Sequence, residues 1–307
     1  MTTQSRRNFL KISAASALGA VALSQVPFSG ADAAIEVDPK TFGIGLQLYT
    51  IRDAMAKDVQ GSLKKVSETG FRYIELAGYN DGKFYGFAPI DFKKIVTDLG
   101  MEVLSSHTQV EAQGITLDNA KKMAEDHAKL GVKYCIQPWV VEEARKTIDS
   151  FKRMAADWNK VGRIMKENNI QFGYHNHNFE FGKVEGKTPY YDVFMLELDK
   201  DLVTMELDLF WATKAGQNPV EMFKKYPGRF QLFHMKDMFT KEAPFFKTVT
   251  NDFAPVGSGV INFKEILAAR SIAGNKFLIV EQDSTKDGKP FDAIKTSITN
   301  LTTKLLK

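Results

Sequence analysis

A short apolar segment followed by an amphipathic stretch recurs eight times along this chain, and this repeat limits the possible folds more than any other feature. The apolar segments begin roughly 28 to 46 residues apart, the length of one strand, one helix and their loops. We predict a strand in each of them: Ile44–Tyr49, Tyr73–Leu76, Glu102–Ser105, Tyr134–Gln137, Gln171–His175, Val203–Leu207, Gln231–His234 and Phe277–Val280.

The stretches between these strands carry helix signals. Thr116 precedes apolar residues at helical spacing and Gly131 follows them, which predicts a capped helix between the two. Asp91 is expected to cap a helix over Phe92–Leu99. The longest 3.6-residue pattern runs from about Glu142 to Asn168 and predicts one continuous helix.

Eight strand–helix units favour a closed parallel (β/α)8 barrel, the TIM barrel, because closure leaves no exposed sheet edge. The alternative is an open doubly wound sheet. Such a sheet would carry a glycine-rich turn after its first strand for a dinucleotide, but Gly43-Ile44-Gly45 lies at or before that strand. We therefore predict one barrel domain over residues 34–307, with a hydrophobic content of 44% in the whole chain.

Residues 1–33 have the organisation of a secretory signal peptide. Arg6 and Arg7 precede an apolar, Ala- and Ser-rich run over residues 12–26, and Ala31-Asp32-Ala33 fits a cleavage site. The paired arginines favour the twin-arginine route, so we expect an exported, periplasmic protein with no stable membrane insertion after processing. An uncleaved anchor is the alternative.

The charge balance argues against a nucleic-acid partner. Removing the signal peptide takes Lys plus Arg from 41 to 38 and Asp plus Glu from 37 to 36, a net charge of +2. This gives no electrostatic case for binding nucleic acid or an anionic membrane. Cys135 is the only cysteine, so an internal disulfide is excluded.

Polar side chains gather where the predicted strands end, and four of the five histidines are among them. In a TIM barrel the reacting groups project from these ends. His175, Asp208, His234 and Glu281 follow strands five to eight and offer two imidazoles and two carboxylates. Such a set suits one divalent ion: Mn2+, Co2+, Fe2+, Zn2+ or Mg2+. Strand alternation puts His177 on the same side as His175, so either could be the ligand.

Several short motifs, in their order and spacing along the chain, resemble the sugar phosphate isomerase/epimerase family, also described as xylose isomerase-like barrels. Relatives in this family include ketose 3-epimerases and inosose dehydratases. The resemblance rests on these segments: Gly45–Thr50, Tyr73–Gly78, Gly173–His177 with Glu180, Glu206–Asp208 with Ala215-Gly216, His234–Asp237, Pro255–Phe263 and Val280-Glu281. Together they span almost all of the chain after residue 33.

The resemblance implies a metal held by Glu, Asp, His and Glu at the ends of strands five to eight. Asp208, His234 and Glu281 match the last three, whereas His175 stands in the place of the first glutamate. Epimerases of this family use the two ligand glutamates as opposed acid and base, so simple two-carboxylate epimerisation is in doubt. Trp211 also replaces a histidine that many relatives carry three residues after the aspartate.

The expected reaction starts with removal of a proton beside a carbonyl, and a metal ion stabilises the enediolate. Glu281, Glu75 or His177 would act as the base, and Lys236, His107 or a water as the acid. Returning the proton gives an isomerase or epimerase, whereas expelling a β-substituent gives a lyase or dehydratase. The residues expected to bind a sugar or keto-sugar are Tyr49, Trp139, Trp211 and Glu180.

An exported enzyme should act on an unphosphorylated sugar, because phosphorylated sugars are mainly cytoplasmic. Three other classes of protein remain as alternatives. A two-domain periplasmic sugar-binding protein conflicts with the continuous repeat, and an endonuclease-IV-like phosphodiesterase conflicts with the small net charge. A barrel that binds sugar without catalysis would lack a bound or activating divalent ion.

Overall fold

The computed structural model describes residues 43–109, 114–184, 188–240, 246 and 250–307. The predicted signal peptide, residues 1–33, and the expected start of the exported chain at residue 34 lie outside the described residues.

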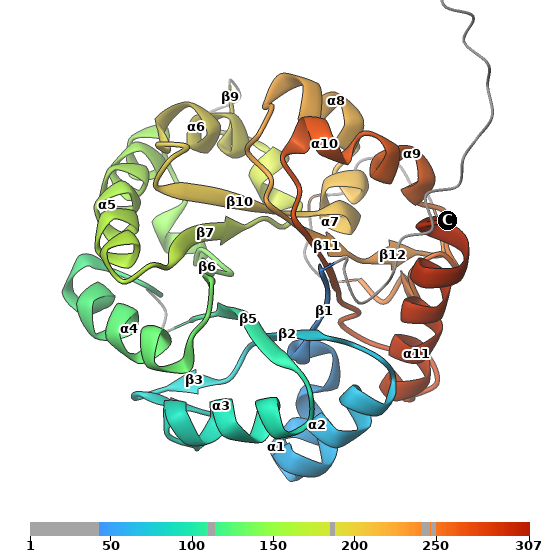
Figure 1. Cartoon of the computed structure of the whole chain (residues 1–307). Helices are drawn as coiled ribbons and strands as arrows, with labels where there is room; N and C mark the ends of the chain where they lie inside the picture. Colours follow the sequence, from blue (N-terminus) through green and yellow to red (C-terminus); the bar gives the residue numbers. More distant parts are fainter. Residues whose placement is uncertain (1–42, 110–113, 185–187, 241–245, 247–249) are drawn as a thin grey trace, which may run out of the picture. The chain divides into compact units, whose positions relative to one another are not determined.

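Eight parallel strands close into the predicted barrel, and the helices surround it (Figure 1). Each barrel strand pairs in parallel with its two neighbours, and β1 closes the ring by pairing with the last strand. In order around the barrel the strands are β1 (Gly43–Gln47), β2 (Tyr73–Leu76), β5 (Glu102–His107), β6 (Tyr134–Gln137), β7 (Gln171–His175), β10 (Val203–Asp208), β11 (Leu232–Met235) and β14 (Phe277–Val280).

The helices follow the strands as a TIM barrel requires. They are α1 (Arg52–Lys57), α2 (Val59–Glu68), α3 (Pro89–Asp98), α4 (Leu117–Leu130), α5 (Ile148–Glu167), α6 (Tyr190–Glu197), α7 (Leu209–Lys214), α8 (Pro219–Lys225), α9 (Phe263–Ala268), α10 (Arg270–Ala273) and α11 (Pro290–Asn300). Short antiparallel pairs in the loops are Tyr79–Asn80 with Lys83–Phe84, Lys183–Val184 with Thr188–Pro189, and Asp237–Met238 with Phe253–Ala254.

The helix ends confirm the predicted cap at Thr116 and contradict the predicted cap at Asp91. Thr116 caps α4 in a capping box with Asn119, and Gly131 ends that helix in the left-handed conformation at φ 89°. Such a cap typically stabilises the folded protein by about 1 kcal/mol. Asp91 is not a cap, because Pro89 starts α3 and places Asp91 inside its first turn.

The predicted long helix is in fact two elements. A 3-10 turn over Glu142–Ala144 comes first, and α5 begins only at Ile148. Thr147 accepts a hydrogen bond from the backbone N–H of Ser150, and the Ser150 side chain binds back to Thr147, which fixes the start of the helix. The capping box therefore decides the boundary that periodicity alone could not place.

The barrel interior changes from apolar to polar along its axis. One layer of inward side chains is apolar and consists of Leu104, Tyr134, Ile136, Leu232 and Ile279. Towards the carboxyl ends of the strands the inward side chains are polar and buried, which costs free energy unless they are paired. The fold therefore concentrates its unusual chemistry at one end of the barrel.

Within the described residues, no helix has both the length and the apolar character needed to cross a membrane.

Candidate metal centre

The carboxyl ends of four neighbouring strands bring the predicted ligands together. His175 ends β7, Asp208 ends β10, His234 lies in β11 and Glu281 directly follows β14. One ligand atom from each lies within 4.8 Å of the others, and all four side chains are buried. These residues are up to 106 positions apart in sequence, so only barrel closure assembles them.

The distances in this outer layer fit a metal ion. His175 Nε2 and His234 Nδ1 lie 3.8 Å and 3.9 Å from Asp208 Oδ2, and His234 Nδ1 lies 3.0 Å from Glu281 Oε2. Two ligand atoms about 2.0–2.1 Å from a tetrahedral ion are roughly 3.4 Å apart. Asp208 Oδ2 is buried and makes no hydrogen bond to any described residue, although Lys236 Nζ is 3.2 Å away. The donor set therefore fits a divalent cation.

A second, inner layer of carboxylates lies beneath these ligands. Glu206 Oε2 is 2.5 Å from His107 Nε2 and 3.2 Å from both His175 Nδ1 and His234 Nε2. Glu75 Oε1 is 2.7 Å from His234 Nε2, and both Glu75 and Glu206 are fully buried. The group His107, His175, Glu206 and His234 also has ligand atoms within 4.8 Å of one another.

Burial and these charges together set the pKa values of the site. Burial acts to lower the pKa of His234, but Glu206, Glu281 and Glu75 outweigh it and hold that pKa well above its usual value. Burial and then His234 lower the pKa of His175 to about 3, so its imidazole is neutral. Burial raises the pKa of Asp208 to about 6, against the opposing effect of Lys236.

Lys236 is a permanently charged member of the site. Its Nζ lies 2.5 Å from Glu281, 2.8 Å from Asp283 and 3.2 Å from Asp208. Burial disfavours the ammonium, but these three carboxylates outweigh burial and hold the pKa of Lys236 well above its usual value. A group that keeps its proton so firmly acts as a fixed positive charge and a hydrogen-bond donor.

A cavity of about 410 Å3 opens above the outer layer. Most of the residues assigned to catalysis or substrate binding from the sequence line it: Tyr49, His107, Trp139, His177, Trp211, Lys236 and Glu281. The structure brings His175 rather than His177 into the ligand cluster. His177 stands in the cavity wall, its ring 4.7 Å from Trp139 and 5.5 Å from Trp211, and its Nδ1 makes no hydrogen bond within the described part of the chain.

Glu75 and Glu180 do not line this cavity. Glu75 lies behind His107 and His234, and its oxygens accept hydrogen bonds from Gln47 and Ser105. Glu180 is fully buried: it accepts a hydrogen bond from the Tyr174 hydroxyl at 2.5 Å and from the His177 backbone N–H at 3.0 Å. Its carboxylate anchors the loop after β7, and this geometry does not support the predicted substrate contact.

Sequence reasoning gave Glu206 no role, although a signal for it existed. Glu206 and Asp208 are two positions apart in β10, so strand alternation points both into the barrel. A buried carboxylate one layer below a metal ligand is a usual partner for ligating histidines.

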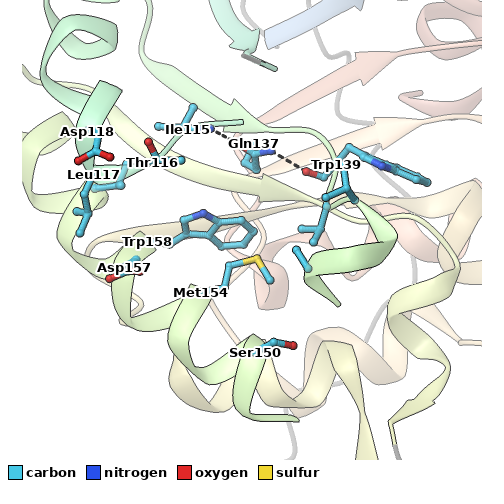
Figure 2. A pocket seen from close by; sticks show the side chains of 14 residues that line it. Ile115, Thr116, Leu117, Asp118, Gln137, Trp139, Ser150, Met154, Asp157 and Trp158 are labelled. Carbon is cyan, nitrogen blue, oxygen red and sulfur yellow. Dashed lines mark hydrogen bonds between the residues drawn. The ribbon is translucent and has the colours of Figure 1, made fainter. Parts of the chain in front are cut away.

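A second cavity of about 420 Å3 lies between the start of α4, the loop after β6 and α5 (Figure 2). Figure 2 shows the Trp158 ring at its centre with Met154 beside it, while Gln137 bonds to the Ile115 N–H and the Trp139 carbonyl. Trp139 lines both cavities. Among the described residues, no histidine lines the second cavity.

Residues 63–303 match the family described as the xylose isomerase-like TIM barrel. A sugar phosphate isomerase/epimerase from Parabacteroides distasonis is a similar solved structure, with a TM-score of 0.74 and 29% identity over 89% of this chain and 99% of that one. The structure of IOLI protein with a binding zinc atom has a TM-score of 0.69 and 18% identity over 86% of this chain and 99% of that one, a likeness of fold.

Inosose dehydratase from Lacticaseibacillus casei is 30% identical over 158 residues, which are 48% of this chain and 52% of the relative. The chain spans about half the length of the curated relatives it matches. The family match, in contrast, extends over most of the barrel. The family match agrees with the barrel of eight parallel strands and with the buried cluster of histidines and carboxylates at the carboxyl ends of those strands. The chain belongs to the xylose isomerase-like TIM barrel family.

Proposed function

We propose that this protein is a divalent-metal-dependent isomerase or epimerase that removes and returns a proton beside the carbonyl of a sugar or keto-sugar. One observation carries the proposal. His175, Asp208, His234 and Glu281 offer ligand atoms within 4.8 Å of one another at the floor of a cavity whose walls hold His177 and Lys236.

The ligand set bears on the choice of ion. A bound divalent ion would supply a Lewis acid that stabilises negative charge on the substrate oxygens. Two imidazoles with two carboxylates favour Mn2+, Co2+ or Zn2+ over Mg2+, which prefers oxygen ligands. The zinc atom in the IOLI structure, a barrel of the same fold, supports this choice.

His177 is the best candidate for the base. It lines the cavity, and its Nδ1 has no hydrogen-bond partner among the described residues. Glu281 is instead engaged by Lys236 at 2.5 Å and by His234 at 3.0 Å. Glu75 lies outside the cavity lining. Burial lowers the pKa of His177 well below its usual value, so its imidazole is neutral, and the Nδ1 lone pair can meet a substrate proton without breaking a hydrogen bond.

Lys236 would stabilise the oxyanion that forms when the proton leaves. Its ammonium lies in the cavity wall and is fixed by Asp208, Glu281 and Asp283. A fixed donor in a buried site needs little reorganisation as charge develops. This role fits Lys236 better than that of proton donor, which leaves His107 or a water to return the proton.

The cavity walls suit a polyol. Tyr49, Trp139 and Trp211 line the cavity and offer aromatic faces, and the Arg52 guanidinium lies 4.3 Å from the Tyr49 ring centre. Aromatic faces and a few fixed polar groups are the usual combination in sites for small polar ligands. A free sugar or keto-sugar fits this composition.

Elimination is the second candidate reaction. Several curated relatives are inosose dehydratases. In this site Asp283 and Lys236 form a pair 2.8 Å apart in the cavity wall, beside Glu281. Such a pair could assist departure of a hydroxyl group after the same proton removal. The product distinguishes the two reactions, because elimination releases water and forms a double bond.

The test is a screen of free sugars, 3-keto-sugars and glycosides with the metal-loaded protein in D2O, read by NMR. We expect deuterium beside the carbonyl of the true substrate and an epimer or isomer as the product. His177→Gln should slow exchange about 100- to 10,000-fold while metal binding is kept. A confirmed substrate that acquires no deuterium would overturn the proposal, and a protein with no bound or activating ion would point to a non-catalytic sugar-binding barrel.

We also propose that the protein is exported by the twin-arginine route and acts on an unphosphorylated substrate. Arg6 and Arg7 before the apolar run at residues 12–26 support this. Replacing both with lysine should keep the protein in the cytoplasmic fraction. An unchanged periplasmic fraction would contradict the proposed route.

A further inference from the structure

Three imidazoles converge on one oxygen in the inner layer of the barrel. His107 Nε2, His175 Nδ1 and His234 Nε2 lie 2.5, 3.2 and 3.2 Å from Glu206 Oε2. The Glu206 side chain is fully buried, and its other oxygen has no hydrogen-bond partner in the described part of the chain. A single buried oxygen thus faces three of the five histidines of the protein.

The direction of these hydrogen bonds follows from chemistry. An ionised carboxylate only accepts, so an imidazole nitrogen bonded to it must carry a hydrogen. For His175 this puts the proton on Nδ1, and Nε2 is left to present its lone pair to the outer layer, 3.8 Å from Asp208 Oδ2. His234 differs, because its Nε2 lies 2.7 Å from Glu75 and its Nδ1 lies 3.0 Å from Glu281, so both of its ring nitrogens bond to carboxylates.

We infer that Glu206 is a positioning residue that fixes which nitrogen of His175 is offered to the metal ion. This rests on the proposed metal centre in the outer layer. Glu206 touches neither the cavity nor the outer-layer carboxylates, so it acts only through the histidines. Because β10 carries both Glu206 and Asp208, one strand supplies a predicted ligand and the group that orients another.

Glu75 provides the contrast that isolates this role. It also lies in the inner layer and contacts His234 and His107, at 2.7 and 3.1 Å. It is held from behind by Gln47 and Ser105. Among the described contacts only Glu206 hydrogen-bonds to Nδ1 of His175, so the two carboxylates should differ in their effect on that ring.

A purely structural role explains Glu206 poorly. Replacing a buried ion pair with apolar residues is often neutral or stabilising, so a buried carboxylate with an unpaired oxygen is a weak device for stability. Partners that orient ligating histidines, in contrast, typically change metal affinity about 10- to 100-fold when removed.

The experiment compares Glu206→Leu, Glu206→Gln and the matched control Glu75→Gln in the full chain. Histidine labelled with 15N reports which nitrogen of His175 is protonated in metal-free protein, and a chelator competition gives the affinity for Zn2+. We expect Glu206→Leu to move the His175 proton away from Nδ1 and to weaken Zn2+ binding about 10- to 100-fold. Glu206→Gln keeps an acceptor oxygen, so it should keep the proton on Nδ1 and lose less affinity.

Glu75→Gln should leave the His175 signal unchanged. The inference is overturned if Glu206→Leu keeps both the Nδ1 proton and wild-type affinity. If that variant does not fold, Glu206→Gln is compared with Glu75→Gln. A loss of Zn2+ affinity in Glu206→Gln that is no larger than the loss in Glu75→Gln then overturns the inference. A wild-type protein that binds no divalent ion would overturn the proposed function itself, which separates the two failures.

Discussion

Two cavities of nearly equal size lie at the same end of this barrel, and they differ in where their walls come from. The cavity over the barrel axis, about 410 Å3, is lined by strand ends and the loops that follow them. The cavity between α4 and α5, about 420 Å3, is lined largely by the two helices and the loops that lead into them (Figure 2). Trp139 belongs to both walls.

The difference lies in what each wall can bring together. Strand ends collect His175, Lys236 and Glu281 from three different strands around one axis, and these side chains are buried and charge-coupled. The helical cavity gathers Met154, Trp158 and the exposed carboxylate of Asp157, and the described residues that line it form no comparable cluster. The convergence of buried ionisable side chains, rather than cavity volume, therefore favours the cavity over the barrel axis as the candidate active site.

The strongest challenge to this comparison is removal of one outer-layer ligand. We expect Asp208→Asn and His234→Ala each to abolish metal binding and activity while the protein still folds, because the first removes the negative charge of one predicted ligand and the second removes a ligand nitrogen. The effect should exceed the roughly 10- to 100-fold loss caused by outer-shell changes. Metal analysis with circular dichroism measures it.

His127→Gln is the matched control. His127 is buried in α4, where it bonds to Thr108 and to the Met123 carbonyl, away from the cluster. This variant should lose stability but keep its metal. Full occupancy in both Asp208→Asn and His234→Ala would show that these residues are not ligands.

Lys236→Met should separate metal binding from catalysis. Removing a donor that stabilises a developing oxyanion typically lowers kcat about 100- to 1,000-fold. The same change removes a positive charge 3.2 Å from Asp208 and 2.5 Å from Glu281, so metal affinity should be equal or tighter. Steady-state kinetics and chelator competition on one preparation give both numbers. Weaker metal binding would mean that Lys236 organises the ligands instead.

The barrel itself could be predicted from sequence because strand length and apolar character repeat. The bounds of β2, β6, β7 and β14 match the prediction to the residue. The predicted helix starts were wrong where two local sequence signals compete. Pro89 displaced the expected Asp91 cap, and the capping box at Thr147 divided the predicted long helix.

The structure brings together the four side chains that the sequence predicts as metal ligands, and their role as ligands stays a prediction. His175, Asp208 and His234 are the last polar residues of their strands and Glu281 directly follows β14, positions that the barrel fold gives a meaning. Glu206 lies one layer deeper, and the sequence analysis gave it no role. The substrate contact predicted for Glu180 stays a prediction, and its bonds to Tyr174 and His177 depend on a loop conformation that no sequence pattern specified.

Glu180 gives a pH-dependent test of the wall that the two cavities share. It holds the His177 backbone, and the His177 ring packs against Trp139. Burial raises the pKa of Glu180 from 4.5 to about 7. Between these values the folded protein keeps a proton that the unfolded chain releases, so the free energy of unfolding falls as pH rises through this window.

The decrease in the free energy of unfolding that Glu180 causes across this pH window has an upper limit of about 3 kcal/mol. Glu180→Gln cannot titrate and should lack this part of the slope. Urea unfolding at pH 5 and pH 8 measures the difference between variant and wild type. Identical slopes in the two proteins would mean that Glu180 titrates near its ordinary pKa.

The smallest effect is expected in the helical cavity. Asp157 lines it and forms a surface ion pair with Lys160 at 3.1 Å, with more than half of each side chain exposed. Such pairs contribute at most about 1 kcal/mol, so Asp157→Ala should change the free energy of unfolding by less than that. It should leave kcat/KM within about twofold of wild type, because surface changes away from a site are usually near neutral. A tenfold loss of kcat/KM with the true substrate would show that the helical cavity takes part in binding.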